Sequence, residues 1–118
     1  MAGTRGAASG RRMRRSDYLT STSEGVRRPT KFFIAFLFDR GDGGRSRLGI
    51  TVTRKVGGAV RRNRIKRLLR EWFRSRRSEF GSCDLVLIAK RECPESLRLD
   101  DVRKDLDPAL LPAPRREA

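Results

Sequence analysis

The chain contains no histidine and only two cysteines, Cys83 and Cys93. Because histidine is the commonest general base in enzymes, its absence removes the usual partner of a catalytic nucleophile. Two cysteines without a histidine do not match the ligand spacing of a zinc site. We therefore predict no catalytic and no metal-binding residues, and we expect both cysteines to be reduced thiols, with Cys83 buried.

Long hydrophobic segments are also missing. No apolar run reaches the roughly 18 residues of a transmembrane helix, and the first residues lack the apolar stretch of a secretory signal. A length of 118 residues predicts a single domain. We expect a cytoplasmic protein with no membrane partner and a small core, since only 36% of the residues are hydrophobic.

Acidic residues are scarce, because 14 Asp and Glu stand against 29 Lys and Arg. The formal charge is +15 and the pI is near 11.5. This balance favours an anionic partner, either nucleic acid or a membrane surface. Segment 1–15 is basic and glycine-rich and has no acid. We predict a disordered arm there, which either settles on RNA or is a solvated tail without a role.

The clearest pattern lies in residues 51–74. Gly57 and Gly58 interrupt a strand-like run, and apolar side chains then recur with the spacing of one helix face: Ile65, Leu68, Leu69, Trp72 and Phe73. The rest of this amphipathic helix is basic: Arg64, Lys66, Arg67, Arg70 and Arg74. One face is therefore predicted to be buried and the other to present a row of cations.

Such a row of like charges is costly to the helix. Nine Lys and Arg lie between Arg61 and Arg77, against the single acid Glu71. Like charges one turn apart repel, and cations in the first turn oppose the helix dipole. A charge run is usually a solvated face, but its nearly uniform sign favours a polyphosphate partner that relieves the repulsion.

The other segments predict three strands and two further helices. A short helix is expected at 16–24, capped by Ser16 or Asp17, and a loop at 25–30. The strands are expected at 31–38, 47–55 and 83–89. A last helix carries Leu99, Val102, Leu106 and Leu110. We expect Pro108 to end or kink this helix early, and residues 112–118 to be frayed.

Two of these strands have faces that could meet a ligand. In 31–38 both faces are apolar, so each phenylalanine is either a core residue or a platform on which a base stacks. In 47–55 the small, polar face is expected to be open, so that Gly49 lets a nucleotide or another backbone approach closely.

The fold class that follows is a small two-layer α+β fold. We predict one domain over residues 16–111, with three helices and a sheet of four strands at most. The two strands joined through the basic helix predict a βαβ unit, for which a right-handed crossover is the default.

A longer motif surrounds the start of the basic helix: Arg54-Lys55-Val56-Gly57, Ala59-Val60, Arg62-Asn63-Arg64-Ile65-Lys66-Arg67 and Leu68-Leu69-Arg70-Glu71. It resembles the protein subunit of bacterial ribonuclease P, whose hallmark is an Arg-Asn-Arg motif on a basic helix. The resemblance implies a left-handed βαβ crossover, in a fold shared with the second domain of a small-subunit ribosomal protein.

The resemblance also implies which residues bind RNA. The set that would contact the catalytic RNA is basic apart from one asparagine: Arg54, Lys55, Arg61, Arg62, Asn63, Arg64, Lys66, Arg67 and Arg70. A cleft between the sheet and the first helix would hold the 5′ leader of precursor tRNA through Tyr18, Phe36 and Thr53. Thr22 departs from the family, in which a second aromatic is common at that position.

The function implied is that of the protein component of an endoribonuclease holoenzyme. The RNA subunit would cut precursor tRNA with Mg²⁺ that the RNA binds, giving the mature 5′ end, and the protein would act on no small-molecule substrate. Two alternatives come from the residues: a ribosomal or other structural RNA-binding protein, and a nuclease acting alone. The second is disfavoured because no acid–base constellation is present.

Overall fold

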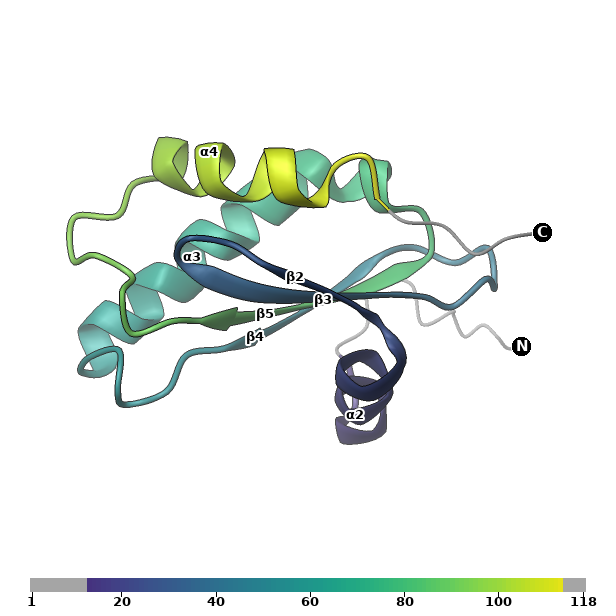
Figure 1. Ribbon diagram of the computed structural model, residues 1–118, viewed down its shortest axis with the longest axis horizontal. Coiled ribbons are helices and arrows are strands. Elements are labelled where there is room, and N and C mark those ends of the chain that lie inside the picture. Colours follow the sequence, from purple (N-terminus) through teal and green to yellow (C-terminus); the bar gives the residue numbers. More distant parts are fainter. Residues whose placement is uncertain (1–12, 114–118) are drawn as a thin grey trace.

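The centre of the fold is a four-stranded mixed sheet with the strand order β2-β3-β5-β4 (Figure 1). The computed structural model describes residues 13–113, so most of the predicted arm and tail lies outside it. The strands are β2 (Val26–Pro29), β3 (Phe33–Asp39), β4 (Arg47–Thr51) and β5 (Cys83–Ala89). The pairs β2–β3 and β3–β5 are antiparallel, whereas β4 runs parallel to β5. The predicted βαβ unit is thus β4, α3 and β5.

In the described part of the chain three α-helices flank this sheet: α2 (Arg15–Glu24), α3 (Ala59–Arg76) and α4 (Leu99–Leu110). A short 3-10 turn, Arg77–Phe80, follows α3. Helices α3 and α4 lie on one side of the sheet and α2 on the other (Figure 1). The predicted α+β class, with three helices and four strands, is confirmed.

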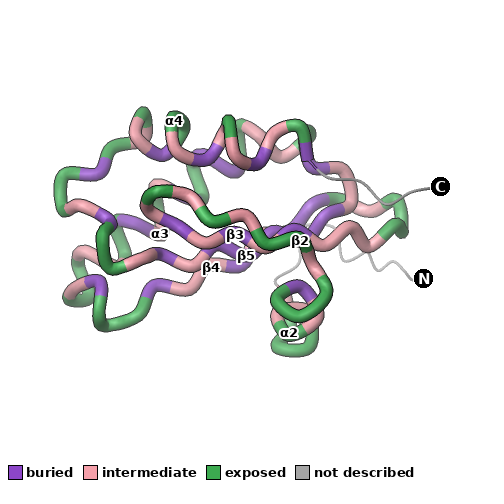
Figure 2. The backbone as a smooth tube through the Cα atoms, in the orientation of Figure 1, coloured by how far each residue is buried: buried purple, intermediate pink, exposed green. Residues whose placement is uncertain are grey.

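The main core lies between the sheet and the α3–α4 layer, where buried segments concentrate (Figure 2). In β3 every second residue is buried, namely Phe33, Ala35 and Leu37. Leu85 and Leu87 of β5 continue this face. The amphipathic pattern of α3 is confirmed, because its buried residues belong to the predicted stripe: Ile65, Leu69, Trp72 and Phe73.

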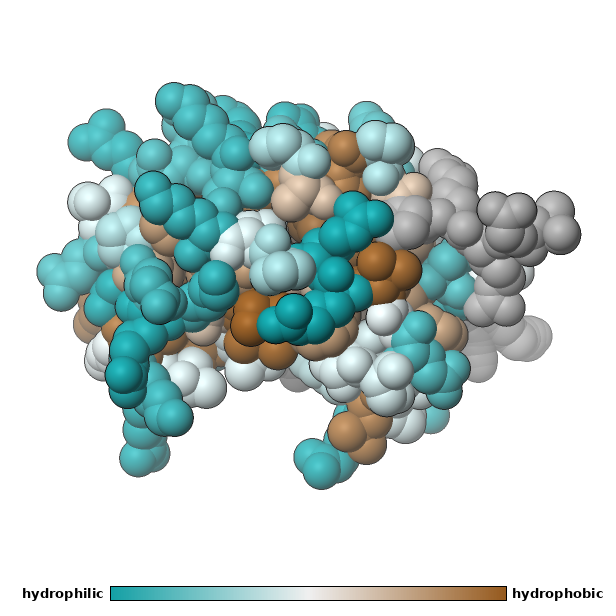
Figure 3. All heavy atoms as spheres, in the orientation of Figure 1, coloured by the Kyte–Doolittle hydropathy of each residue, from teal (hydrophilic) through white to brown (hydrophobic). Residues whose placement is uncertain are grey.

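Few large apolar side chains reach the outer surface. On the face drawn in Figure 3, hydrophilic residues cover most of the surface and apolar residues gather only in small patches. Among residues 13–113, the large hydrophobic side chains that are exposed are Leu19, Val26 and Val60. The modest hydrophobic content of the chain therefore lies mainly in its core.

The two cysteines are free and buried, as expected for Cys83. Burial raises the pKa of the Cys93 thiol to about 11. No helix formed by residues 13–113 combines the length and hydrophobicity that crossing a bilayer requires.

The predicted loop at 25–30 is wrong, since residues 26–29 form the edge strand β2. This short segment has no apolar alternation of its own, and it is extended because it pairs with residues 34–37 of β3. Pro29 is tolerated because it ends an edge strand, where a missing N–H costs little. The predicted strand 47–55 is also too long, since β4 ends at Thr51.

The predicted early end of the last helix is wrong too, since α4 continues through Pro108 to Leu110. A proline there removes a single helical hydrogen bond. Side-chain contacts of helix residues before and after Pro108 offset this loss. Asp105 accepts hydrogen bonds from the Thr30 hydroxyl and the backbone N–H of Lys31. Leu110 is fully buried.

Two boundaries of the predicted domain also shift. Arg15, assigned to the arm, is the first residue of α2, and Asp17 accepts a hydrogen bond from the backbone N–H of Arg14 at 2.7 Å. Asp17 therefore lies inside the first turn of α2 and stabilises the helix start from there; it is not the capping residue that precedes the helix. At the other end, Ala113 is 8% exposed and packs on the core.

Helix α4 is tied to α3 by Asp107. Its carboxylate accepts hydrogen bonds from Trp72 Nε1 at 2.8 Å and from the Arg76 guanidinium, where Nη2 lies 2.8 Å away. Burial alone would raise the pKa of Asp107, but the hydrogen bonds from Arg76 and Trp72 outweigh it and lower the pKa below its ordinary value.

We expect Asp107 to contribute to the pH dependence of stability. Because its folded-state pKa is lowered, its contribution is present above the unfolded-state value of about 4 and is lost as the pH falls through the folded-state pKa. Asp107→Asn should lower the free energy of unfolding at neutral pH and flatten its decline toward acid, as measured by urea denaturation. An acid decline as steep as in the wild type would contradict this role. Asp100→Asn, an exposed change on the same helix, controls for loss of charge.

Candidate nucleic-acid interface

Helix α3 begins directly after a glycine, and its first turn contains no acid. Gly58 is the residue before the helix, and no side chain caps the free N–H groups. Asn63, Arg64 and Arg67 are exposed on the helix, and Arg54 and Lys55 are exposed in the turn that leads into it. The structure thus brings most of the predicted RNA-binding residues onto the surface around the beginning of α3.

Arg61 does not belong to this exposed set. Its guanidinium donates hydrogen bonds to the backbone carbonyls of Val56 and Cys93. It therefore ties the first turn of α3 to the turn before it and to the loop after β5. In this conformation the donors that would meet a phosphate are engaged by the protein, so the predicted RNA contact of Arg61 requires these bonds to break.

Arg62 is only partly exposed. Its Nε atom is buried and has no hydrogen-bond partner among residues 13–113. The Arg-Asn-Arg motif is thus presented unevenly, with Asn63 and Arg64 projecting into solvent and Arg62 lying against the protein.

A groove runs between the open edge of β4, the start of α2 and the basic side of α3. Its volume is about 570 Å³. Its lining combines cationic, aromatic and aliphatic side chains: Met13, Tyr18, Arg47, Leu48, Ile50, Lys66, Arg70, Phe73, Arg74 and Arg77. Lys66 and Arg70 were predicted to bind RNA, whereas Arg47, Arg74 and Arg77 were not. Helical spacing placed Arg74 in the cationic row of α3, but no local pattern could have brought Arg47 and Arg77 to it, because the groove joins three elements.

The residues predicted for the leader cleft are spread over the sheet. Tyr18 of α2 packs over Gly49, and its hydroxyl lies 3.5 Å from the carbonyl oxygen of Ile50. Phe36 is partly exposed on the same sheet face, paired with Val86 of β5. Thr53 is exposed beyond the end of β4. The expectation that Gly49 is open to a ligand is wrong, because the Tyr18 ring covers it.

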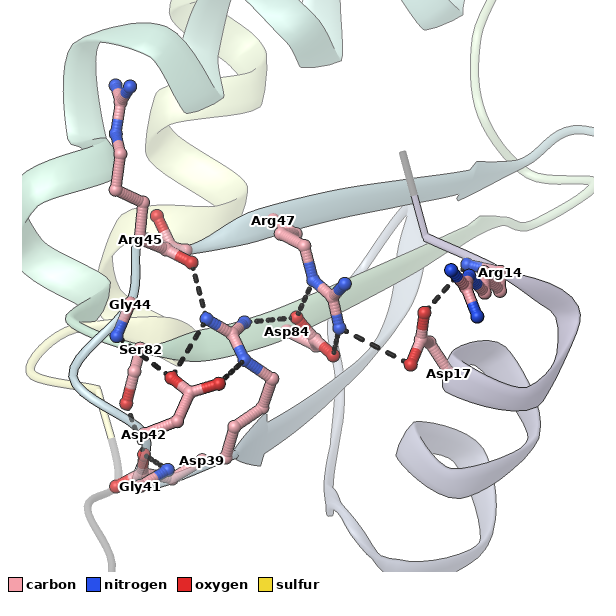
Figure 4. A network of polar contacts seen from close by, with 12 residues as sticks. Arg14, Asp17, Asp39, Gly41, Asp42, Gly44, Arg45, Arg47, Ser82 and Asp84 are labelled. Carbon is pink, nitrogen blue, oxygen red and sulfur yellow. Dashed lines mark hydrogen bonds and ion pairs between the residues drawn. The ribbon is translucent and has the colours of Figure 1, made fainter. Parts of the chain in front are cut away.

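A buried ion network holds α2 against this sheet face (Figure 4). Asp84 of β5 is 2% exposed and accepts hydrogen bonds from Arg47 Nε at 2.7 Å and Nη2 at 2.6 Å. Arg40 donates to the same carboxylate, and Arg47 Nη2 lies 3.4 Å from Asp17 of α2. The hydrogen bonds to Asp84 raise the pKa of Arg47 above its ordinary value. Arg47 therefore lines the groove with its charge largely compensated.

The other cations of the groove are poorly compensated. Within residues 13–113, Lys66 and Arg70 form no ion pair, and the pair between Arg74 and Glu71 is long, at 3.7 Å, and exposed. The Arg77 guanidinium lies 5.6 Å from the centre of the Phe73 ring. Burial, and then the nearby charge of Arg45, lowers the pKa of Arg77. The groove therefore has a positive potential that a polyanion would relieve.

Among the described residues, no three His, Cys, Asp or Glu side chains form a group that could hold a metal ion. What the arrangement offers is hydrogen-bond donors and positive charge beside apolar surface, which suits the binding of a polyanion.

Comparison with known proteins identifies the family of this chain. The family model described as Ribonuclease P matches residues 9–113. The chain belongs to the ribonuclease P protein family. It is 46% identical over 99 residues to the ribonuclease P protein component of Oleidesulfovibrio alaskensis, covering 82% of this chain and 74% of that one. The corresponding protein of Syntrophus aciditrophicus is 42% identical over 86% of this chain and 85% of its own length.

Solved ribonuclease P proteins share the fold. The protein from Thermotoga maritima superposes with a TM-score of 0.71 at 36% identity, over 80% of this chain and 90% of that one. The protein from Staphylococcus aureus gives a TM-score of 0.74 at 26% identity, over 83% and 89% of the two chains. The predicted family is therefore confirmed, and the chain is a protein component of ribonuclease P, a tRNA-processing ribonucleoprotein.

The contact between Tyr18 and Gly49 yields a test of how α2 is seated. A methyl group at position 49 would lie 2.6 Å from Cζ and from Oη of Tyr18, so Gly49→Ala must displace the ring. We expect it to cost about 1–3 kcal/mol of stability, as overpacking does. Measured by urea denaturation, the same change should cost little when Tyr18→Ala is already present. An equal cost in both backgrounds would show that the ring is not the obstacle.

Proposed function

We propose that the chain binds the catalytic RNA of ribonuclease P through the exposed side of α3 and its preceding turn. The observation that supports this is the presentation of Asn63, Arg64 and Arg67 on a helix whose opposite side is buried. A fixed helix presents its cations without further loss of backbone freedom, which favours a tight contact with phosphates. Membership of the ribonuclease P family supports an association with this RNA.

In this proposal the RNA cuts the precursor tRNA with Mg²⁺ ions that the RNA itself holds. The chain supplies cations that neutralise phosphate repulsion between catalytic RNA and substrate. It thereby raises substrate affinity and lowers the magnesium concentration that the reaction requires. In this scheme no side chain of the protein takes part in a covalent step. The complex acts in the cytoplasm.

We further propose that the 5′ leader of precursor tRNA lies on the sheet face beside α2. Phe36 is partly exposed there, while Phe33 and Leu37 of the same strand are buried on the opposite face. A partly exposed aromatic ring in a sheet offers a surface on which an unpaired base can stack. Tyr18 borders this face, and Thr53 lies beyond the end of β4.

Arg64→Ala should weaken binding to a bacterial ribonuclease P RNA and flatten its salt dependence. Each phosphate that the protein no longer neutralises reduces the slope of log K against log salt by roughly 0.7–0.9. Filter binding at several salt concentrations measures both quantities. Arg103→Ala, on the exposed side of α4, removes one positive charge elsewhere and should leave the slope unchanged.

Arg61→Ala should behave differently from Arg64→Ala because its guanidinium is bound to the protein. We expect a loss of stability of about 1–3 kcal/mol, the cost of leaving buried carbonyls without a partner, and an unchanged salt slope for the folded protein. A reduced slope with full stability would place Arg61 on the RNA instead.

Phe36→Ala should reduce affinity for precursor tRNA with a leader but not for mature tRNA, when both are bound by the reconstituted holoenzyme. The loss expected for one stacked base is about 1–3 kcal/mol. Equal losses for both RNAs would mean that Phe36 acts through the fold. A chain that bound a structured RNA tightly, but did not distinguish these substrates, would instead fit a structural RNA-binding protein.

A further inference from the structure

The groove beside β4 combines an apolar surface with a cationic one. Its floor is apolar, formed by Leu48 and Ile50, which are partly buried against the core at the open edge of the sheet. One wall is cationic, formed by Lys66, Arg70 and Arg74 of α3. A solvated row of cations needs no apolar floor, whereas an RNA strand uses both surfaces, apolar for a base and cationic for phosphates.

The spacing of the cations adds to this. Lys66, Arg70 and Arg74 follow one another at intervals of four residues, so they lie on one side of α3, one above the other, and repel. Within residues 13–113 the one ion pair that any of the three forms is that of Arg74 with Glu71, which is long, at 3.7 Å, and exposed. A run of such charges along a helix matches consecutive phosphates of an RNA strand better than a single small anion.

The volume sets the size of the occupant. About 570 Å³ is in the range of pockets that bind a drug-sized molecule. It accommodates one nucleobase with its sugar but not a base-paired helix. RNA is read by proteins mainly where bases are unstacked and splayed out, resting on aromatic or apolar side chains while cations hold the phosphates.

We propose that this groove binds one unstacked nucleotide of single-stranded RNA, with its base on Leu48 and Ile50 and its flanking phosphates on Lys66, Arg70 and Arg74. The inference rests on the proposed RNA-binding function and adds a second single-strand site to it. The site is distinct from the surface around Phe36, because β5 lies between β3 and β4 in the sheet. Tyr18 stands between the two surfaces.

The test uses the full chain with labelled methyl groups, followed by NMR. The probes are a single-stranded pentaribonucleotide, the same pentamer with an abasic central position, and inorganic phosphate. We expect the intact pentamer to shift the Leu48 and Ile50 methyl signals and to bind about tenfold more tightly than the abasic one. Val26, exposed on the opposite edge strand, is the reference and should not shift.

Two double variants that lose the same charge distinguish binding of the base in the groove from general electrostatic attraction of the RNA to the protein. Arg70→Ala with Arg74→Ala should bring the affinity ratio of intact to abasic pentamer close to one. Arg64→Ala with Arg67→Ala should weaken both pentamers but keep the ratio. Unmoved Leu48 and Ile50 signals at saturating pentamer, or equal shifts from inorganic phosphate, would overturn the nucleotide site.

This outcome can be told apart from failure of the proposed function. If the chain stimulates cleavage of precursor tRNA by ribonuclease P RNA but the methyl signals do not respond to the pentamer, only the groove is wrongly assigned. If the methyl signals respond and cleavage is not stimulated, the groove binds RNA and the proposed function fails.

Discussion

The packing of one side of α3 against the sheet is the interaction on which the rest of the structure depends. Ile65, Leu69 and Trp72 of this helix are almost fully buried, whereas the cations on its other side repel one another. Hydrophobic burial of about 1.5–3 kcal/mol per large side chain exceeds the few tenths lost for each like-charged pair. The helix can therefore carry a concentration of cations that it could not sustain as an isolated peptide.

The arginines of this chain fall into two groups with different roles. Arg47 and Arg40 surround buried Asp84, Arg61 binds backbone carbonyls, and Arg76 binds Asp107. These side chains stabilise the fold and are poor RNA ligands while so engaged. The second group projects from α3 and the turn before it, where its one ion pair among the described residues is the long, exposed contact between Arg74 and Glu71. The net charge of +15 thus overstates the charge that is available to a partner.

The elements that could be predicted from the sequence are those whose conformation follows from the pattern of their own residues. The amphipathic stripe of α3 and the apolar run of β5 are local patterns, and both were located closely. Strand β2 was missed because Val26–Pro29 is extended only through pairing with β3. The structural role of Arg61 was missed because one of its partners, the carbonyl of Cys93, is distant in sequence and is brought near by the βαβ crossover. The groove escaped prediction for the same reason, since α2, β4 and α3 each supply part of it.

The central claim is that this chain presents cations to a catalytic RNA that does the cutting. The most direct measurement is the rate at which a bacterial ribonuclease P RNA removes the 5′ leader of precursor tRNA at limiting magnesium, with and without the purified full chain. The account predicts a faster reaction with the chain, and an advantage that shrinks as magnesium is raised. A rate that the chain leaves unchanged at every magnesium concentration would contradict it.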